Sequence, residues 1–112
     1  MEKDREQLGD LAGEVFDVAD LVSYQEQTIV SRALVDKEAV TMTVFALDEG
    51  QSISEHSAPH AALLQVLDGT GKVEIDGDSY ELSAGESIVF PANVPHAVDA
   101  PSRFKMLLTM VR

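Results

Sequence analysis

The chain has 112 residues, of which 45% are hydrophobic and 25% are charged, a composition that is ordinary for one globular domain. Its formal charge of −12 disfavours nucleic acid and anionic membrane surfaces as partners, and no apolar run approaches the roughly 20 residues of a membrane span. The absence of cysteine excludes a disulfide scaffold, a thiol nucleophile and any cysteine-based metal site, so a metal would need histidine, carboxylate or water ligands.

Residues 1–27 predict a polar segment followed by a short helix. Residues 1–14 are polar and charged without a sustained apolar stripe, so we expect them to be frayed or loosely helical. The mixed charges at the start lack the basic start and apolar run of a signal peptide, which indicates a cytoplasmic protein. The apolar residues between Val15 and Val22 fit one or two helical turns, with Asp17 or Asp20 as the cap.

Residues 28–112 change to short β-type runs separated by turn signals, which predicts one all-β domain, a sandwich or a closed barrel. The clearest hairpin signal is Asp76-Gly77, because glycine supplies the positive φ that a two-residue loop needs. A second turn is predicted at Asp68–Gly71. The expected strands are Thr28–Leu34, Val40–Leu47, Ala62–Leu67, Lys72–Ile75, Ser79–Leu82, Ser87–Phe90 and Phe104–Val111.

Two of these runs, Val40–Leu47 and Phe104–Val111, are apolar on most of both faces. One face of each should line the interior of the domain. The other faces supply more hydrophobic surface than one barrel interior can absorb, and two-fold dimers are the commonest way to bury such an excess. We therefore predict a homodimer.

The candidate metal ligands are the three histidines, His56, His60 and His96. Histidine is the commonest neutral metal ligand and the side chain that titrates nearest physiological pH. A fully extended chain would separate His56 from His60 by about 13 Å, so a shared site requires a turn at Ser57–Pro59. We find no paired carboxylates, Ser-His-Asp arrangement or phosphate-binding glycine loop, so any general acid–base catalysis would fall to the histidines.

The surroundings of two histidines resemble the cupin superfamily, whose motifs are G-x5-H-x-H-x3-E-x6-G and G-x5-P-x-G-x2-H-x3-N. Residues 50–56 (GQSISEH) match the opening of the first motif, and Gly69 matches its close. Residues 85–96 (GESIVFPANVPH) match the second, with Asn93 in place of a glycine; asparagine also tolerates a positive φ. The resemblance covers about residues 28–112 and implies a small single-domain cupin, a jelly-roll barrel also described as a double-stranded β-helix.

The departures from the family pattern fall on metal ligands. Ala58 and Ala62 stand where the motif has its second histidine and its glutamate. The resemblance therefore implies only His56 and His96 as ligand positions. His60 lies between the two lost positions and shares their face if residues 58–62 are extended, which would give a three-histidine site.

Two kinds of function remain open. Three neutral imidazoles suit Zn, Ni, Cu or Fe(II) better than Mg or Ca, and would support a metal-dependent enzyme that activates O2 or polarises a carbonyl of a small molecule. The incomplete ligand set instead favours a non-catalytic, metal-free small-ligand-binding or sensor module, whose histidines only form hydrogen bonds at the barrel mouth. The sequence thus predicts a cytoplasmic cupin that binds a divalent transition metal, a small molecule or both in its barrel, with no assigned activity.

Overall fold

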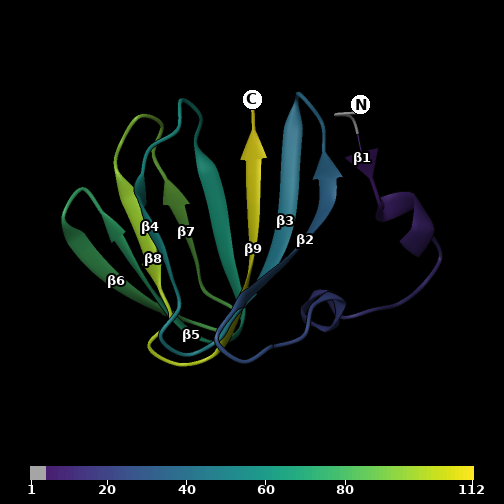
Figure 1. The fold of residues 1–112 in the computed structure, drawn as a ribbon. Helices are drawn as coiled ribbons and strands as arrows, with labels where there is room; N and C mark the ends of the chain where they lie inside the picture. Colours follow the sequence, from purple (N-terminus) through teal and green to yellow (C-terminus); the bar gives the residue numbers. More distant parts are fainter. Residues whose placement is uncertain (1–4) are drawn as a thin grey trace.

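Strands dominate the computed structural model, which describes residues 5–112 (Figure 1). Within this range the helices are two short 3-10 turns, η1 (Leu8–Leu11) and η2 (Val18–Leu21). The strands are β1 (Arg5–Glu6), β2 (Ile29–Asp36), β3 (Val40–Leu47), β4 (Ser52–His56), β5 (Ala62–Ile75), β6 (Asp78–Ser83), β7 (Ser87–Phe90), β8 (His96–Asp99) and β9 (Phe104–Val111). The all-β prediction with a short N-terminal helical segment is therefore confirmed. No helix in residues 5–112 is long and apolar enough to cross a membrane.

The strands form two antiparallel sheets that share the long strand β5. The first half of β5 pairs with β7 and β9, and its second half pairs with β6 and β8. One sheet therefore runs β1-β2-β3-β9-β5-β7, and the other runs β6-β5-β8-β4. In Figure 1 the two sheets diverge from the end of the molecule where β5 bends from one to the other.

The structure corrects the predicted turn at Asp68–Gly71, which is part of β5. A Cβ atom on Gly69, whose φ is 73°, would lie 2.1 Å from the carbonyl oxygen of Arg103. A Cβ atom on Gly71 would lie 2.5 Å from Cε2 of Phe104. The absence of a side chain at these glycines therefore allows β5 to bend and pack closely against the start of β9. The chain does not reverse direction here, as the predicted turn required.

The predicted hairpin at Asp76-Gly77 is confirmed. Ile75 pairs with Asp78, and both loop residues have a positive φ, 50° at Asp76 and 87° at Gly77. This is the backbone that a two-residue hairpin loop between twisted strands requires.

Strands β4 and β8 were not predicted. They have only five and four residues, and most of the side chains of β4 are exposed and polar. Neither shows the apolar alternation on which the prediction of strands depends. Both are nevertheless central to the site, because β4 ends at His56 and β8 begins at His96.

Large apolar side chains fill the space between the two sheets. The alternate residues Leu64 and Val66 of β5 point inward and are 0% and 2% exposed. They pack with residues of several other strands that are buried in the same cluster, which include Leu47, Phe90, Phe104 and Met106. This core supports the end of the barrel where the histidines lie.

A second apolar cluster lies outside the barrel, between residues 15–24, here called the strap, and the sheet. Val22 of the strap is buried there with Leu34, Val44, Ala46 and Leu107. The outward face of β3 is thus covered by the same chain. Part of the apolar surplus that the sequence analysis assigned to a partner is therefore absorbed within the chain; the homodimer itself stays a prediction.

The start of η2 follows the predicted capping pattern. Asp17 precedes the helix, and its side chain accepts a hydrogen bond from the amide of Ala19 at 3.0 Å. An aspartate at this position satisfies an amide that has no partner within the helix.

Residues 5–11 are more ordered than the sequence predicted; residues 1–4 lie outside the described range. Strand β1 pairs with the end of β2, and the amide of Gln7 donates to the carbonyl of Leu34 at 2.7 Å. Nε of Arg32 donates to the side-chain oxygen of Gln7 at 2.9 Å. Backbone pairing and polar contacts order residues 5–11. Such contacts produce no apolar periodicity, so the sequence pattern could not predict this order.

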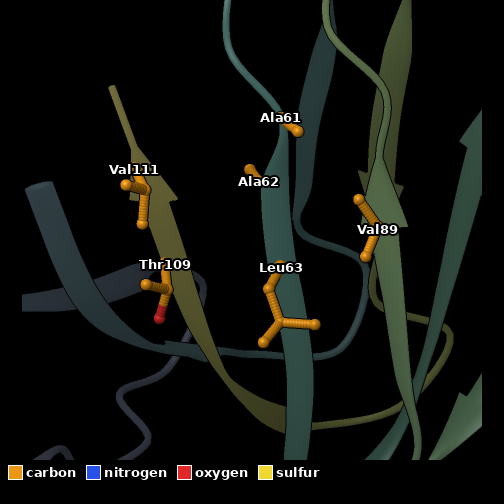
Figure 2. A pocket seen from close by; sticks show the side chains of 6 residues that line it. All are labelled: Ala61, Ala62, Leu63, Val89, Thr109 and Val111. Carbon is orange, nitrogen blue, oxygen red and sulfur yellow. The ribbon is translucent and has the colours of Figure 1, made fainter.

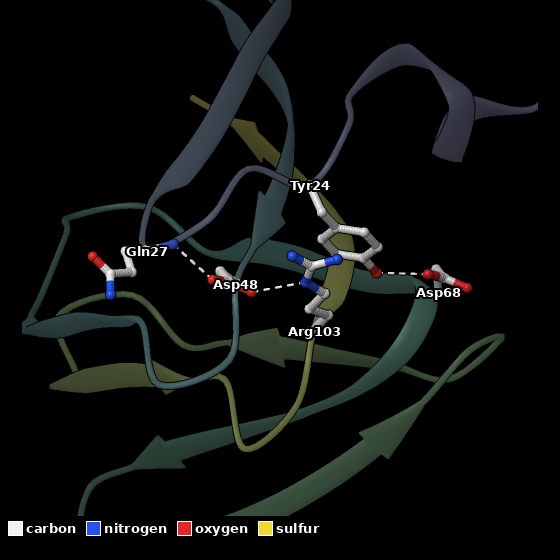
Figure 3. Close-up of polar contacts among 5 residues, drawn as sticks. All are labelled: Tyr24, Gln27, Asp48, Asp68 and Arg103. Carbon is white, nitrogen blue, oxygen red and sulfur yellow. Dashed lines mark hydrogen bonds and ion pairs between the residues drawn. The ribbon is translucent and has the colours of Figure 1, made fainter.

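Tyr24 fastens the strap to the barrel (Figure 3). Its hydroxyl donates to Oδ2 of Asp68 at 2.5 Å. Nζ of Lys105 and the guanidinium carbon of Arg103 lie 5.0 and 5.4 Å from the centre of its ring, a cation–π arrangement. Burial and the bond to Asp68 raise the pKa of Tyr24, so the hydroxyl stays protonated and remains a donor.

Asp48 extends this polar cluster to the start of β2 (Figure 3). Its carboxylate accepts from Nε of Arg103 at 2.8 Å and from the amide of Gln27 at 2.6 Å. These hydrogen bonds lower the pKa of Asp48 and hold three loops of the chain together at one end of the barrel.

The Tyr24→Phe variant is expected to lose about 1 kcal/mol of unfolding free energy, because it removes one hydrogen bond. The cation–π contacts of the ring with Arg103 and Lys105 are kept. Urea unfolding measures this loss. The matched control is Tyr80→Phe, because Tyr80 is 44% exposed on β6 and its hydroxyl has no hydrogen bond within residues 5–112. Equal stability of the two variants would contradict a fastening role for the Tyr24 hydroxyl.

Candidate functional site

His56 and His96 meet across two neighbouring strands. The antiparallel register of β4 and β8 pairs the two residues directly, after an irregularity in β4 between Ile53 and His56. Their ring centres are 4.5 Å apart and their planes are inclined by 69°. On its other side His96 pairs with Ile75 of β5. The sheet thus brings together two histidines that are distant in the sequence.

His96 is held inside the barrel by an aromatic stack. It is 6% exposed, and its ring lies parallel to that of Phe90, with 4.1 Å between centres and 4° between planes. Burial, together with the neighbouring His56, lowers the pKa of His96, so its imidazole is neutral at neutral pH. Phe90 was not predicted as a site residue, because nothing in the linear pattern distinguishes it from any other core residue.

Both histidines are oriented by a backbone carbonyl two residues earlier in the chain. Nδ1 of His56 lies 2.9 Å from the carbonyl oxygen of Ser54, and Nδ1 of His96 lies 3.1 Å from that of Val94. A carbonyl oxygen only accepts, so each Nδ1 carries the proton. In a neutral imidazole the lone pair is then on Nε2.

This arrangement fits a metal ion chemically. Histidine ligands of metals almost always donate their second ring nitrogen to a carbonyl or carboxylate, which fixes the tautomer and the ring orientation. His56 and His96 both have such a partner at Nδ1, which leaves Nε2 as the ligand atom of each neutral ring. Two protein ligands would leave several coordination positions for water or for a substrate.

His60 is not joined to this pair by any contact that the structure records in residues 5–112. It is half-buried in a bend next to Pro59, between β4 and β5. Throughout residues 5–112, no three histidine, aspartate or glutamate side chains are grouped as a metal-holding set. The three-histidine site therefore stays a prediction, and it requires the bend to bring His60 closer to the other two.

The loops beside the two histidines are hydrogen-bonded to each other. The amide of Asn93 donates to the carbonyl of Ala58 at 2.7 Å. Asn93 has a φ of 62°, as expected for a residue that replaces a glycine of the motif. Ala62, at the position of the missing glutamate, is 4% exposed in the core. The backbone frame of both motifs is thus kept, while Ala58 and Ala62 supply no ligand atom.

Comparison with known proteins decides the family. A family model described as a cupin domain matches residues 43–112, which include both histidine motifs. The chain belongs to the cupin family. The predicted resemblance is therefore confirmed. No curated protein matches this cupin.

Several solved structures are similar to this cupin. A conserved protein of unknown function from Streptococcus pyogenes is 38% identical with a TM-score of 0.87, over 89% of this chain and 88% of that one. A cupin 2 conserved barrel domain protein from Leptotrichia buccalis is 47% identical with a TM-score of 0.84, over 87% of this chain and 47% of that one. A cupin superfamily protein from Desulfitobacterium hafniense is 26% identical with a TM-score of 0.85, over 88% and 91%.

None of these three descriptions names a metal, substrate or reaction. This cupin also spans about half of the Leptotrichia buccalis protein, since the match covers 47% of that chain. The chemistry of the site must therefore be argued from the residues of this chain, because one fold hosts many functions.

Proposed function

We propose that this cupin is a cytoplasmic protein that binds a divalent transition metal through Nε2 of His56 and Nε2 of His96. The observation that carries the proposal is the pair of Nδ1-to-carbonyl hydrogen bonds, to Ser54 and to Val94. They leave both Nε2 atoms free in rings whose centres are 4.5 Å apart. A second ring nitrogen held by a carbonyl is the usual arrangement of histidines that bind a metal.

Neutral imidazole ligands favour Zn, Ni, Cu or Fe(II) over Mg or Ca. The bound metal would supply a Lewis acid that polarises an oxygen of a small molecule at the open coordination positions. His60 is the candidate third ligand, reached by movement of the bend at Pro59 and His60. The stack of His96 on Phe90 excludes water from one side of the site.

A metal-free small-ligand-binding or sensor module is the second candidate function. Two observations favour it. Ala58 and Ala62 occupy two of the four ligand positions of the family motif. Residues 5–112 also hold no grouping of three metal-ligating side chains. In that case the histidine pair would donate or accept hydrogen bonds to an organic ligand.

Elemental analysis of protein purified without a histidine tag distinguishes the two functions. The metal proposal predicts about one transition-metal atom per chain, either as purified or after incubation with Ni²⁺ or Co²⁺ and removal of excess metal. Protein that retains no metal after such incubation would contradict the metal proposal and support the metal-free module.

A further inference from the structure

The candidate metal site has no negatively charged ligand in the chain. Its two ligand atoms, Nε2 of His56 and Nε2 of His96, belong to neutral rings. Between residues 5 and 112, no aspartate or glutamate groups with the two histidines as a third ligand. A divalent metal held by this pair would therefore keep its whole positive charge. Burial of His96 against Phe90 makes such a charge costly unless an anion pairs with it.

Ala62 lies where the chain could have supplied that anion. It pairs with Phe90 of β7, and the ring of Phe90 stacks on His96. Figure 2 shows the side chains that line a hollow on the other face of β5, β7 and β9: Leu63, Val89, Thr109 and Val111. Side chains alternate along a strand, so Ala62, Phe90 and Met110 face the interior of the barrel. At Ala62 the interior face has a methyl group where a longer acidic side chain would bring a carboxylate toward the histidines.

The inner face beyond Ala62 is apolar and is not fully buried. Met110 pairs with Ala62, and both Leu108 and Ile88 pair with Leu64, two residues further along β5. Met110, Leu108 and Ile88 are half-buried, although all three pack against the core. Strand β9 is paired on both sides, with β3 and β5, so the exposed part of Leu108 faces the space between the sheets. An apolar surface therefore continues from the histidine pair into the barrel.

The charge of the chain determines when an anion can bind to this surface. With 20 acidic and 8 basic residues, the chain repels small anions in general. The inner wall at Ile88, Leu108 and Met110 carries no cation. Arg112, which follows β9, donates instead to the carbonyls of Lys37 and Glu38, at 3.3 and 3.5 Å. Only a bound metal would then attract an anion into the barrel, so anion binding should require the metal.

We infer that the ligand of this cupin is a small organic anion, a carboxylate with a short apolar body, an inference that rests on the proposed metal site. The carboxylate takes an open coordination position on the metal and supplies the negative charge that the chain lacks. The apolar body lies along Met110, Leu108 and Ile88.

Calorimetric titration of hexanoate into Zn²⁺-loaded and into metal-free protein tests the role of the charge. Hexanoate should bind the Zn²⁺-loaded protein about tenfold or more tightly than the metal-free protein, and saturating hexanoate should raise the affinity for Zn²⁺ by the same factor, because the coupling is reciprocal. Hexanamide has nearly the same shape and no charge, and should not show this preference. Equal binding of hexanoate to the two forms, or hexanamide that matches hexanoate, would overturn the inference.

The length of the carboxylate tests the role of the apolar body. From acetate to butyrate to hexanoate, the affinity for Zn²⁺-loaded protein should rise by up to about fourfold for each buried methylene. In protein with ¹³C-labelled methionine methyl groups, hexanoate should shift the signal of Met110. The signal of Met42, which packs in the cluster outside the barrel, should stay in place. Equal affinities along the series, or a Met110 signal that does not move, would contradict binding along the inner wall.

The variant Ala62→Glu tests whether the ligand replaces a missing carboxylate, with Ala62→Gln as the uncharged match. Ala62→Glu should bind Zn²⁺ more tightly than wild type and lose the preference for hexanoate over hexanamide, whereas Ala62→Gln should keep it. Because Ala62 is 4% exposed, circular dichroism checks both folds, and if either variant is unfolded the comparison of hexanoate with hexanamide on wild type decides. A folded Ala62→Glu protein that keeps the preference would overturn the inference.

The outcomes also separate this inference from the proposed function. Wild type that binds no Zn²⁺, with or without hexanoate, would refute the metal site and the inference together. Wild type that binds Zn²⁺ with an affinity that hexanoate leaves unchanged would refute the inference alone.

Discussion

His56→Ala and His96→Ala are each expected to abolish transition-metal binding to this cupin. The proposed site has two protein ligands, and one remaining imidazole holds a metal no better than any surface histidine. Loss of an orienting neighbour alone typically costs about 10–100-fold in affinity, and loss of a ligand should cost more. Calorimetric titration with Ni²⁺ measures the affinity of each variant.

The controls separate loss of a ligand from loss of the fold. His56 is exposed, so His56→Ala should keep the thermal stability of wild type, whereas His96→Ala leaves space beside Phe90 and should be less stable. His60→Ala should weaken binding without abolishing it. Folded His56→Ala protein that binds Ni²⁺ as wild type does would contradict the site.

Metal affinity should also fall at acidic pH, because ligation requires neutral imidazoles; burial lowers the pKa of His96, so that ring stays neutral to a lower pH than an ordinary histidine. Titrations with Ni²⁺ between pH 5 and pH 7.5 measure this dependence. An affinity that is constant over the range would contradict histidine ligation.

Gly69→Ala is expected to lower the unfolding free energy by about 2–5 kcal/mol. The new methyl would lie 2.1 Å from the carbonyl oxygen of Arg103, so backbone must move, at a cost of about 1–3 kcal/mol. The φ of 73° adds about 1–2 kcal/mol, because a Cβ disfavours the left-handed region. Urea unfolding measures the sum.

Gly77→Ala is the matched control for this prediction. Gly77 also has a positive φ, 87°, but a Cβ there would meet no atom within 4 Å. It should therefore lose only the conformational part, about 1–2 kcal/mol. Equal losses at the two glycines would contradict the account of Gly69 as the point where β5 and β9 approach most closely.

The strands that the sequence predicted correctly are those that carry apolar side chains which become buried in a core. Val40–Leu47, Ser87–Phe90 and Phe104–Val111 have the predicted bounds, because each contains apolar residues that enter a core. Strand β4 was missed because it is short and largely polar, and β8 was missed because it has only four residues and shows no apolar alternation. The glycines of β5 were taken for a turn, because only the position of Phe104 reveals what the missing Cβ makes room for.

The candidate site was partly accessible from the sequence. The motif resemblance pointed to His56 and His96, which the structure brings together. The stack on Phe90 and the two carbonyl partners depend on how the strands pair and on the backbone geometry at the strand ends. A sequence pattern does not contain this information. The position of His60 depends on a loop around Pro59 whose conformation no periodicity determines.

The imidazole nitrogen spectrum of ¹⁵N-labelled protein tests the central claim most directly. Without metal, at neutral pH, His56 and His96 should both show a protonated Nδ1 and a bare Nε2. One equivalent of Zn²⁺ should shift the Nε2 resonances of both residues together and leave each Nδ1 protonated. Nε2 resonances of His56 and His96 that do not move with Zn²⁺, or that move at only one of the two residues, would contradict a metal site built on this pair.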